Sequence, residues 1–238
     1  IIFEPFYENY IPDGILSGAV PRFVRLHAPG WHFDHKELAA AFNSRTKAII
    51  INTPNNPTGK VFSEEELKEI AGLCRQWNVF AITDEIYEHI LYDEARHLSI
   101  ASMPGMEEHG ITINSVSKTY SVTGWRVGWA IAPARVTSAI RKVHDFMTVG
   151  APTPFQHAAA AALQFPASYY EKLGKQYANA RQFLYETLQE SGFRPYLPQG
   201  AYYIMADAGP LAHRLNTSDD FEFSLELLKR TRVATVPG

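Results

Sequence analysis

Residues 115–129, SVSKTYSVTGWRVGW, place a lysine among small hydroxyl side chains and an arginine between two tryptophans. Lys118 has no acidic residue nearby in the sequence, whereas surface lysines usually lie among other charges. Such a lysine can form a covalent bond through its amine, and hydroxyls together with Arg126 can bind an anion such as a phosphate. For one lysine considered alone, an irregular solvated turn is the better interpretation. The rest of the chain must therefore decide between the two.

Three short apolar runs are each followed at once by polar residues. KAIIIN (47–52) is followed by TPNNPTG, VFAIT (79–83) by DEIY, and GITIN (110–114) by SVSK. Such runs are typical of buried strands, and the ligands of open α/β sheets bind beyond the carboxyl ends of the strands. We therefore expect these polar residues to lie at one edge of a sheet, which a random scatter would not produce.

The side chains at this predicted edge form a chemically complete set. Asp84 supplies an acid, Tyr87 a phenol and Asn56 an amide, beside the Lys118 amine and the Arg126 guanidinium. Taken singly, each has a more common explanation, such as a helix N-cap for Asp84 or a turn residue for Asn56. Together they match what pyridoxal phosphate requires. The cofactor needs a lysine to form an imine with its aldehyde, a carboxylate to hold its ring nitrogen protonated, and donors for its phosphate.

Three other patterns favour different sites less strongly. PTGK is similar to a phosphate-binding loop, but the upstream glycine is missing and Val61 replaces the required serine or threonine. His32 and His35 have no evident third ligand, so we expect no metal site. The triplet 216–218, Asn-Thr-Ser, fits a glycosylation acceptor, which matters only in a secreted protein.

The chain has 238 residues, of which 46% are hydrophobic and 20% charged, with a formal net charge of -3. This is the composition of an ordinary globular protein with a substantial core. The basic residues are scattered, so we expect no nucleic-acid partner. No apolar run approaches the roughly 18 residues of a membrane helix, so we expect no membrane partner either. The one cysteine, Cys74, is expected to be a buried structural thiol, which favours a reducing compartment and a cytoplasmic location.

The elements that must position these residues alternate between strand and helix. Ser63, followed by three glutamates and LKEIAGLCRQW, predicts a helix that begins with a capping box. VGWAIA (127–132) is a further apolar run, and helix-length segments separate the runs. We therefore predict an α/β fold, a three-layer α/β/α sandwich with a mostly parallel sheet and helices on both faces.

A long helix is predicted in the last third of the chain. It runs from about Ala167 to Ser191, starts just after Pro166 and is stopped by Gly192. This helix ends the larger of two predicted units.

We expect two domains. Residues 1–191 form a large cofactor-binding domain that is incomplete at its N-terminus. Residues 192–238 begin a smaller α/β domain, with AYYIMAD (201–207) and the helix-like FEFSLELLKR (221–230). Because the chain opens without methionine and both of its ends fall in mid-element, we expect it to be part of a longer protein.

These residues carry a resemblance to a known family. NTPNNPTGKVFS (52–63), ITDEIYEHILYD (82–93) and SVSKTYSVTGWRVGW (115–129) are similar, in this order, to three motifs of the class I/II aminotransferases, which are fold-type I pyridoxal phosphate enzymes. The resemblance covers essentially the whole chain, and the three motifs together are highly specific. HLSIASMPGM (97–106) and the stretch from VPRFVRL to SRTKAIIINTP are similar to the kynurenine–oxoglutarate/glutamine transaminase branch, which overlaps methionine and aromatic aminotransferases.

The resemblance implies roles for the residues around the reacting centre. Lys118 matches the Schiff-base lysine, which the family also uses to carry a proton between the substrate Cα and C4′ of the cofactor. Asp84 matches the partner of the pyridine nitrogen. Tyr87 and Asn56 match the pair that hydrogen-bonds the phenolic oxygen of the ring and so tunes the pKa of the imine.

It also implies roles at the rim of the site. Arg126 and Ser115 match phosphate ligands, and Ser117 is a further candidate for that role. Tyr7 matches the aromatic residue that stacks on the cofactor ring. Asn52 aligns with an asparagine near the substrate carboxylate in the kynurenine branch.

The resemblance further implies a reaction and partners. An L-amino acid (aromatic, kynurenine, glutamine or methionine-like) gives its amino group to a 2-oxo acid in a ping-pong sequence, in a homodimer with a shared active site. A β-lyase, a decarboxylase or a cyclopropane-carboxylate synthase on the same scaffold is an alternative, since fold alone does not determine reaction type. A transcription regulator with an aminotransferase-like sensor domain is another. Trp125 and Trp129 are expected to pack in the core rather than to form a substrate pocket.

Three family features are expected outside these residues. They are a phosphate loop before Ile1, a tyrosine from the partner subunit, and an arginine beyond Gly238 that binds the substrate α-carboxylate. We therefore expect residues 1–238 alone to be poorly active.

Overall fold

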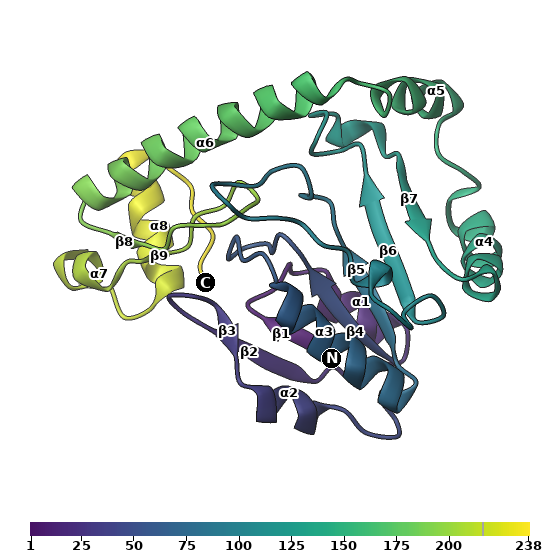
Figure 1. Cartoon of the computed structure of the whole chain (residues 1–238). Coiled ribbons are helices and arrows are strands. Elements are labelled where there is room, and N and C mark those ends of the chain that lie inside the picture. The colour runs from purple at the N-terminus through teal and green to yellow at the C-terminus, as the bar shows by residue number, and fades with distance from the viewer. Residues whose placement is uncertain (216) are drawn as a thin grey trace.

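A seven-stranded sheet forms the centre of the structure, a computed structural model that describes residues 1–215 and 217–238 (Figure 1). The strand order is β3-β2-β1-β4-β5-β6-β7. The strands are β1 (Ile2–Glu4), β2 (Phe23–His27), β3 (His32–Phe33), β4 (Ala48–Asn52), β5 (Phe80–Asp84), β6 (Gly110–Ser115) and β7 (Gly128–Ile131). The five inner strands are mutually parallel, and the edge strands β3 and β7 run antiparallel to their neighbours. The predicted α/β fold with a mostly parallel sheet is confirmed.

Helices connect and cover the strands. They are α1 (Tyr10–Leu16), α2 (His35–Ala41), α3 (Glu64–Trp77), α4 (Ala134–Thr148), α5 (Thr153–Ala162), α6 (Ala167–Glu190), α7 (Gly209–Leu215) and α8 (Asp220–Thr231), with short 3₁₀ turns at Ile100–Ser102 and Thr123–Trp125. In the view of Figure 1, α3 passes in front of the sheet and α1 behind it, while α6 runs along the top of the molecule. Asn216 of the predicted glycosylation acceptor lies outside the described residues.

The predicted capping box begins α3. The Ser63 hydroxyl accepts a hydrogen bond from the Glu66 amide, and the Glu66 carboxylate accepts one from the Ser63 amide. Each bond satisfies an amide that would otherwise lack a partner at the first turn. The helix buries Cys74 completely, as predicted, and this burial raises the pKa of the thiol to about 12. Cys74 is therefore an unreactive packing residue.

The main core lies between the sheet and α3. Ile49 and Ile51 of β4 pack there with Leu67 and Ile70 of the helix, and all four side chains are fully buried. A second, aromatic cluster lies beyond the carboxyl end of β5 and contains Tyr87, Ile90, Tyr92, Leu173 and Ala201. Tyr177 and Tyr202, which line the candidate site, pack against this second cluster.

The C-terminal part agrees with the predictions for its helices and departs from them for its strand. Helix α6 follows Pro166, and Gly192 stops it with a left-handed φ of 94°. Within AYYIMAD only Ala206–Asp207 forms a strand, β9, which pairs with β8 (Arg194–Pro195). At the start of this run and just before it, the backbone of 199–201 is hydrogen-bonded to Gly59, Ile90 and Tyr92. A domain boundary after residue 191 stays a prediction.

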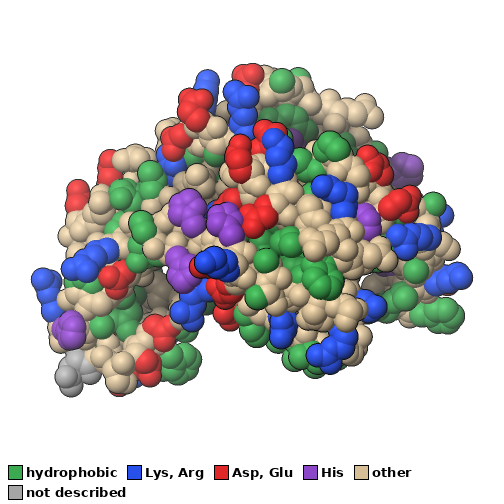
Figure 2. Space-filling view, turned by 60° about the horizontal axis from the view of Figure 1, so that its bottom comes forward, with side chains coloured by type: hydrophobic (Ala, Val, Ile, Leu, Met, Phe, Trp, Pro, Cys, Tyr) green, Lys and Arg blue, Asp and Glu red, His purple; other side chains and the backbone are tan. Residues whose placement is uncertain are grey.

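The surface carries charges of both signs. On the face shown in Figure 2, basic and acidic side chains are interspersed, with small apolar groups between them. None of the helices within the described residues combines the length and the apolarity that crossing a bilayer requires.

Candidate active site

The register of the sheet brings the predicted polar residues to one edge. Asn52, the last residue of β4, lies directly opposite Asp84, the last residue of β5. Asp84 lies opposite Ile113, so β6 continues to Ser115 just beyond it. The carboxyl ends of three neighbouring parallel strands therefore meet, as the positions of the apolar runs predicted.

Lys118 lines a pocket of about 610 Å³ in the turn after β6. The pocket is lined by Ser117, Lys118, Ser121, Thr123, Gly124, Tyr177 and Tyr202. The Lys118 Nζ lies 5.6 Å from the centre of the Tyr202 ring. Within the described part of the chain, Lys118 forms no ion pair. The amine is thus directed to a space large enough for a small organic molecule rather than to a carboxylate.

Asp84 is bonded to a tyrosine that the sequence analysis missed. Its Oδ2 accepts a 2.7 Å hydrogen bond from the Tyr10 hydroxyl, and its Oδ1 accepts one from the Ile86 amide at 3.3 Å. Burial raises the pKa of Asp84 above its ordinary value, although these hydrogen bonds and the nearby Lys118 charge act in the opposite direction. Burial also raises the pKa of Tyr10, with the Asp84 charge as the second cause. A nearby cation would stabilise the ionised form of this partly buried carboxyl group.

Tyr7 belongs to the same group. Its ring meets the Tyr10 ring edge-on, with centroids 5.7 Å apart and an interplanar angle of 81°. The only sequence signal for Tyr10 is its three-residue spacing from Tyr7 at the start of α1. That spacing places both rings near one another, and Tyr10 then links Tyr7 to Asp84.

Asn52 joins β4, β5 and the turn that follows β4. Its Nδ2 donates to the Asp84 carbonyl at 2.9 Å, and its Oδ1 accepts from the Asn56 amide at 2.6 Å. The side chain is only 4% exposed. Asn52 therefore fixes the position of Asn56 relative to Asp84, a structural task in addition to the substrate contact predicted for it.

Tyr87 belongs to the second, aromatic cluster, against which the pocket residues Tyr177 and Tyr202 pack. Its hydroxyl is 2.9 Å from the Tyr203 hydroxyl, and its ring meets the Tyr202 ring edge-on at 5.3 Å. Tyr202 in turn faces Lys118, so these contacts connect Tyr87 with the pocket. The sequence analysis did not select Tyr202 or Tyr203, because adjacent tyrosines in an apolar run are typical of a strand.

The predicted phosphate ligands surround the same turn. The Ser115 hydroxyl accepts a hydrogen bond from the Ser117 amide at 3.1 Å, and Ser117 itself lines the pocket. Arg126 is exposed and donates to the carbonyl of Thr123, another pocket residue, at 3.0 Å. The guanidinium thus lies beside the pocket wall, with donors left for an anion.

The two tryptophans that flank Arg126 are packing residues, as predicted. The Trp125 ring stacks on Phe155 with centroids 5.0 Å apart and an interplanar angle of 9°. Trp129 packs against the small buried cluster of Val116, Val127 and Ala159. Neither is among the residues that line the pocket.

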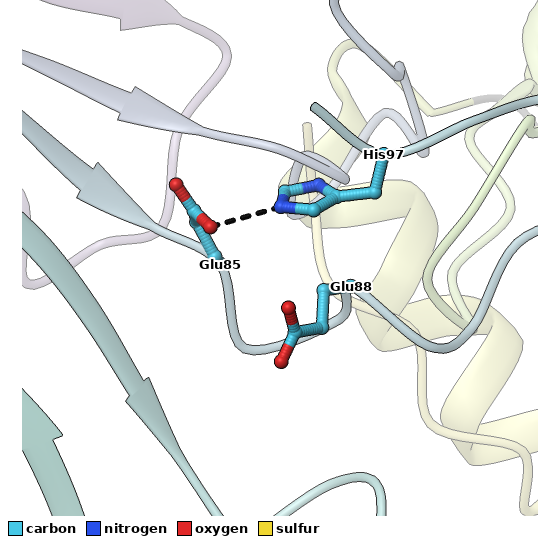
Figure 3. Close-up of side chains that lie close together, drawn as sticks. All are labelled: Glu85, Glu88 and His97. Carbon is cyan, nitrogen blue, oxygen red and sulfur yellow. Dashed lines mark hydrogen bonds and ion pairs between the residues drawn. The ribbon is translucent and has the colours of Figure 1, made fainter. Parts of the chain in front are cut away.

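A hydrogen-bonded carboxylate supports the end of β5 (Figure 3). Glu85 accepts bonds from His97 at 2.9 Å, Ser99 at 2.6 Å and Thr83 at 2.8 Å. Burial would raise the pKa of Glu85, but these bonds and the His97 charge outweigh it and hold the pKa below its ordinary value. Glu88 lies within reach of the same group and accepts from Asn114 at 2.6 Å. Both carboxylates thus have protein donors, and the bonds to the Glu85 side chain hold the chain in place directly after Asp84.

The whole chain, residues 1–238, matches the model of the family Aminotransferase class I and II. The chain belongs to this family. The family is one of pyridoxal phosphate-dependent, fold-type I transaminases, which the three sequence motifs predicted. The residues described above fit that cofactor, since Lys118, which has no carboxylate partner within the described residues, shares the pocket with hydroxyl donors, and the partly buried Asp84 lies at the same sheet edge.

Relatives named for different activities match the chain. Human kynurenine–oxoglutarate transaminase 1 is 40% identical over 234 residues, which is 90% of this chain and 55% of that protein. The structure of N-succinyldiaminopimelate aminotransferase from Mycobacterium tuberculosis has a TM-score of 0.93 at 38% identity, over 99% of this chain and 61% of that one. An aromatic aminotransferase from Pyrococcus horikoshii has a TM-score of 0.90 at 37% identity, over 99% and 63%. The chain therefore spans about half the length of the curated relatives it matches.

Proposed function

We propose that this protein is a pyridoxal phosphate-dependent aminotransferase. It moves the amino group of an L-amino acid of the aromatic, kynurenine, glutamine or methionine-like kind to a 2-oxo acid. The observation that carries the proposal is the Lys118 amine, which lines a pocket of about 610 Å³ at the sheet edge that also holds Asp84. Membership of the family and the similarity to kynurenine–oxoglutarate transaminases support the same reaction class.

Each residue at the centre of the site has one task. Pyridoxal phosphate supplies, when bound, an aldehyde and an electron-withdrawing ring. The Lys118 amine binds that aldehyde. The Asp84 carboxylate would keep a proton on the ring nitrogen. Binding is favoured because this cation offsets the free-energy cost of keeping the carboxylate ionised where water is partly excluded. Tyr87 and Asn56 donate hydrogen bonds to the phenolic oxygen.

The outer residues hold and orient. Arg126 and Ser115, with Ser117, bind the phosphate, for which a planar guanidinium fork is well suited. Tyr7 packs on the face of the ring. Asn52 contributes near the substrate carboxylate through the turn that it anchors.

Proton transfer falls to Lys118. With the cofactor and an amino acid bound, the Lys118 Nζ would act as the general base that takes the proton from the substrate Cα and later returns it. The 2-oxo acid product would leave before the second substrate enters. Double-reciprocal plots of the initial rate, measured at several concentrations of both substrates, should therefore give parallel lines, as in ping-pong kinetics. We further propose that the protein acts as a homodimer.

Absorbance spectroscopy tests the proposal. The purified protein with pyridoxal phosphate should show a yellow, pH-dependent band that one of kynurenine, glutamine, methionine or aspartate bleaches. Lys118→Ala should lack this band, because no other amine lines the pocket within the described residues. A wild-type protein without a lysine-dependent band would refute the cofactor assignment. A band that no amino acid bleaches would favour a sensor over an enzyme.

A further inference from the structure

The hydroxyl groups of Tyr87 and Tyr203 form a hydrogen-bonded pair 2.9 Å apart. Tyr87 is 3% exposed, and the two rings meet edge-on with centroids 5.9 Å apart. Burial raises the pKa of Tyr203 to about 12 and also raises the pKa of Tyr87. Both phenols therefore carry their protons at neutral pH. Since each phenol has one proton to donate, one of the two must accept from the other.

Hydrogen bonds hold the backbone just before Tyr203, and this supports the contact between the Tyr203 and Tyr87 hydroxyls. The Ala201 amide donates to the Ile90 carbonyl at 2.9 Å, and the Tyr92 amide donates to the Gln199 carbonyl at 3.0 Å. The Tyr92 hydroxyl also donates to the Ala201 carbonyl. The segment 199–201, which directly precedes the two tyrosines, is thereby held against the loop that carries Tyr87.

We propose that Tyr203 is a positioning residue that donates its hydroxyl proton to Tyr87 Oη and so leaves the Tyr87 proton free for the phenolic oxygen of pyridoxal phosphate. This role rests on the proposed function. If Tyr87 donated its proton to Tyr203 instead, it could present only an oxygen lone pair to the phenolic oxygen of the cofactor. The two oxygens would then repel each other. In the opposite orientation the two bonds reinforce each other and make Tyr87 a stronger donor.

The expected consequence is a lower pKa for the nitrogen through which Lys118 binds the cofactor. A stronger donor stabilises negative charge on the phenolic oxygen, and this reduces the affinity of the neighbouring nitrogen for a proton. Removing the Tyr203 hydroxyl should raise that pKa in the same direction as removing the Tyr87 hydroxyl.

The test is a spectrophotometric pH titration of the yellow band in the cofactor-loaded protein. Tyr203→Phe keeps the ring and loses one oxygen, and it should raise the midpoint by about 0.5 to 1 pH unit, the range expected for one net hydrogen bond. In a Tyr87→Phe background the same substitution should add nothing, because its effect passes through Tyr87. Tyr92→Phe is the matched control, since it removes a hydroxyl that bonds to Ala201 of the same segment and not to Tyr87.

An unchanged midpoint in Tyr203→Phe would overturn the proposal. So would a rise that persists in the Tyr87→Phe background, or an equal rise in Tyr92→Phe, which would assign the effect to a loosened segment. These outcomes leave the proposed function intact if the wild-type band still depends on Lys118. A wild-type protein without that band would refute both.

Discussion

Among the described residues, the Asp84 carboxylate is partly buried and has no cation among its hydrogen-bond partners, which is a cost to the fold. Burial raises the pKa of Asp84, so its protonated form stabilises the folded state at low pH. That contribution is lost as the pH rises through the raised pKa of the folded state. At neutral pH the ionised side chain depends on the Tyr10 hydroxyl and on the more distant Lys118 charge. A protonated pyridine nitrogen is the partner that would offset this cost.

Asp84→Asn should therefore separate stability from cofactor binding. The cofactor-free variant should unfold at an equal or higher temperature than wild type at pH 7, and the difference should shrink as the pH falls towards the ordinary carboxyl value of 3.8. Its affinity for pyridoxal phosphate should fall by about 10- to 100-fold, because a charge-assisted hydrogen bond is lost. Thermal unfolding and equilibrium binding measure the two effects. A less stable variant, or one with unchanged affinity, would contradict this account.

The positions of site residues that follow strands could be predicted from the sequence. Those of their partners from distant parts of the chain could not. Lys118 and Asp84 come directly after apolar runs, so their place at the sheet edge follows from local pattern alone. Tyr10 is 74 positions away from Asp84, and Tyr203 is 116 positions away from Tyr87. No periodicity encodes such contacts, because they depend on how finished elements pack.

The turn between β4 and α3 is held by backbone contacts with the segment after α6. The Gly59 carbonyl accepts from the amides of Gln199 and Gly200. Gly59 has a left-handed φ of 70°, and a Cβ there would lie 2.2 Å from the Pro198 side chain and 2.8 Å from the Gly200 carbonyl. Only glycine combines this conformation with so close an approach.

Gly59→Ala should destabilise the protein by at least about 2 kcal/mol, because backbone strain adds to the clash. The matched control is Gly72→Ala within α3, where a Cβ would have no neighbour within 4 Å. That substitution should be neutral or stabilise by up to about 1 kcal/mol, since alanine favours the helix. Urea unfolding of both variants measures the difference. Equal stabilities would show that the turn can move away.

Helices were the easiest elements to predict. The capping box of α3, and the proline and glycine that bound α6, are local signals that fix where a helix starts or stops. AYYIMAD was harder because its apolar pattern suits a strand, while its first residue, Ala201, bonds to Ile90 and the two residues before it bond to Gly59. Tertiary hydrogen bonds override local preference there.

At the scale of the whole molecule, helix α4 leaves an apolar stripe uncovered. Val143, Phe146 and Met147 lie three and four residues apart, which places them on one helical face. Their exposed fractions are 58%, 92% and 75%, and α4 lies at the edge of the molecule in Figure 1. A stripe of this kind is typical of a contact surface, and we propose that it contributes to the proposed homodimer.

Phe146→Asp should weaken this dimer by tenfold or more, because a charge would replace a large apolar side chain in the contact. Phe183→Asp on α6 is the matched control, since Phe183 is also exposed, at 73%, and lies on another helix. Light scattering over a range of protein concentrations gives the masses. A dimer that survives Phe146→Asp unchanged would place the contact elsewhere.

The position of β1 between β2 and β4 affects the order in which the site is assembled during synthesis. The ribosome makes β1 and β2 before β4, yet β1 lies between them. A growing chain therefore holds a sheet fragment with an open inner edge until β4 has emerged. The hydrogen bond between Tyr10 and Asp84, and the one between Tyr87 and Tyr203, form only after the second residue of each pair has been synthesised. The nascent protein completes its candidate active site late, and until then an open strand edge is exposed to other chains.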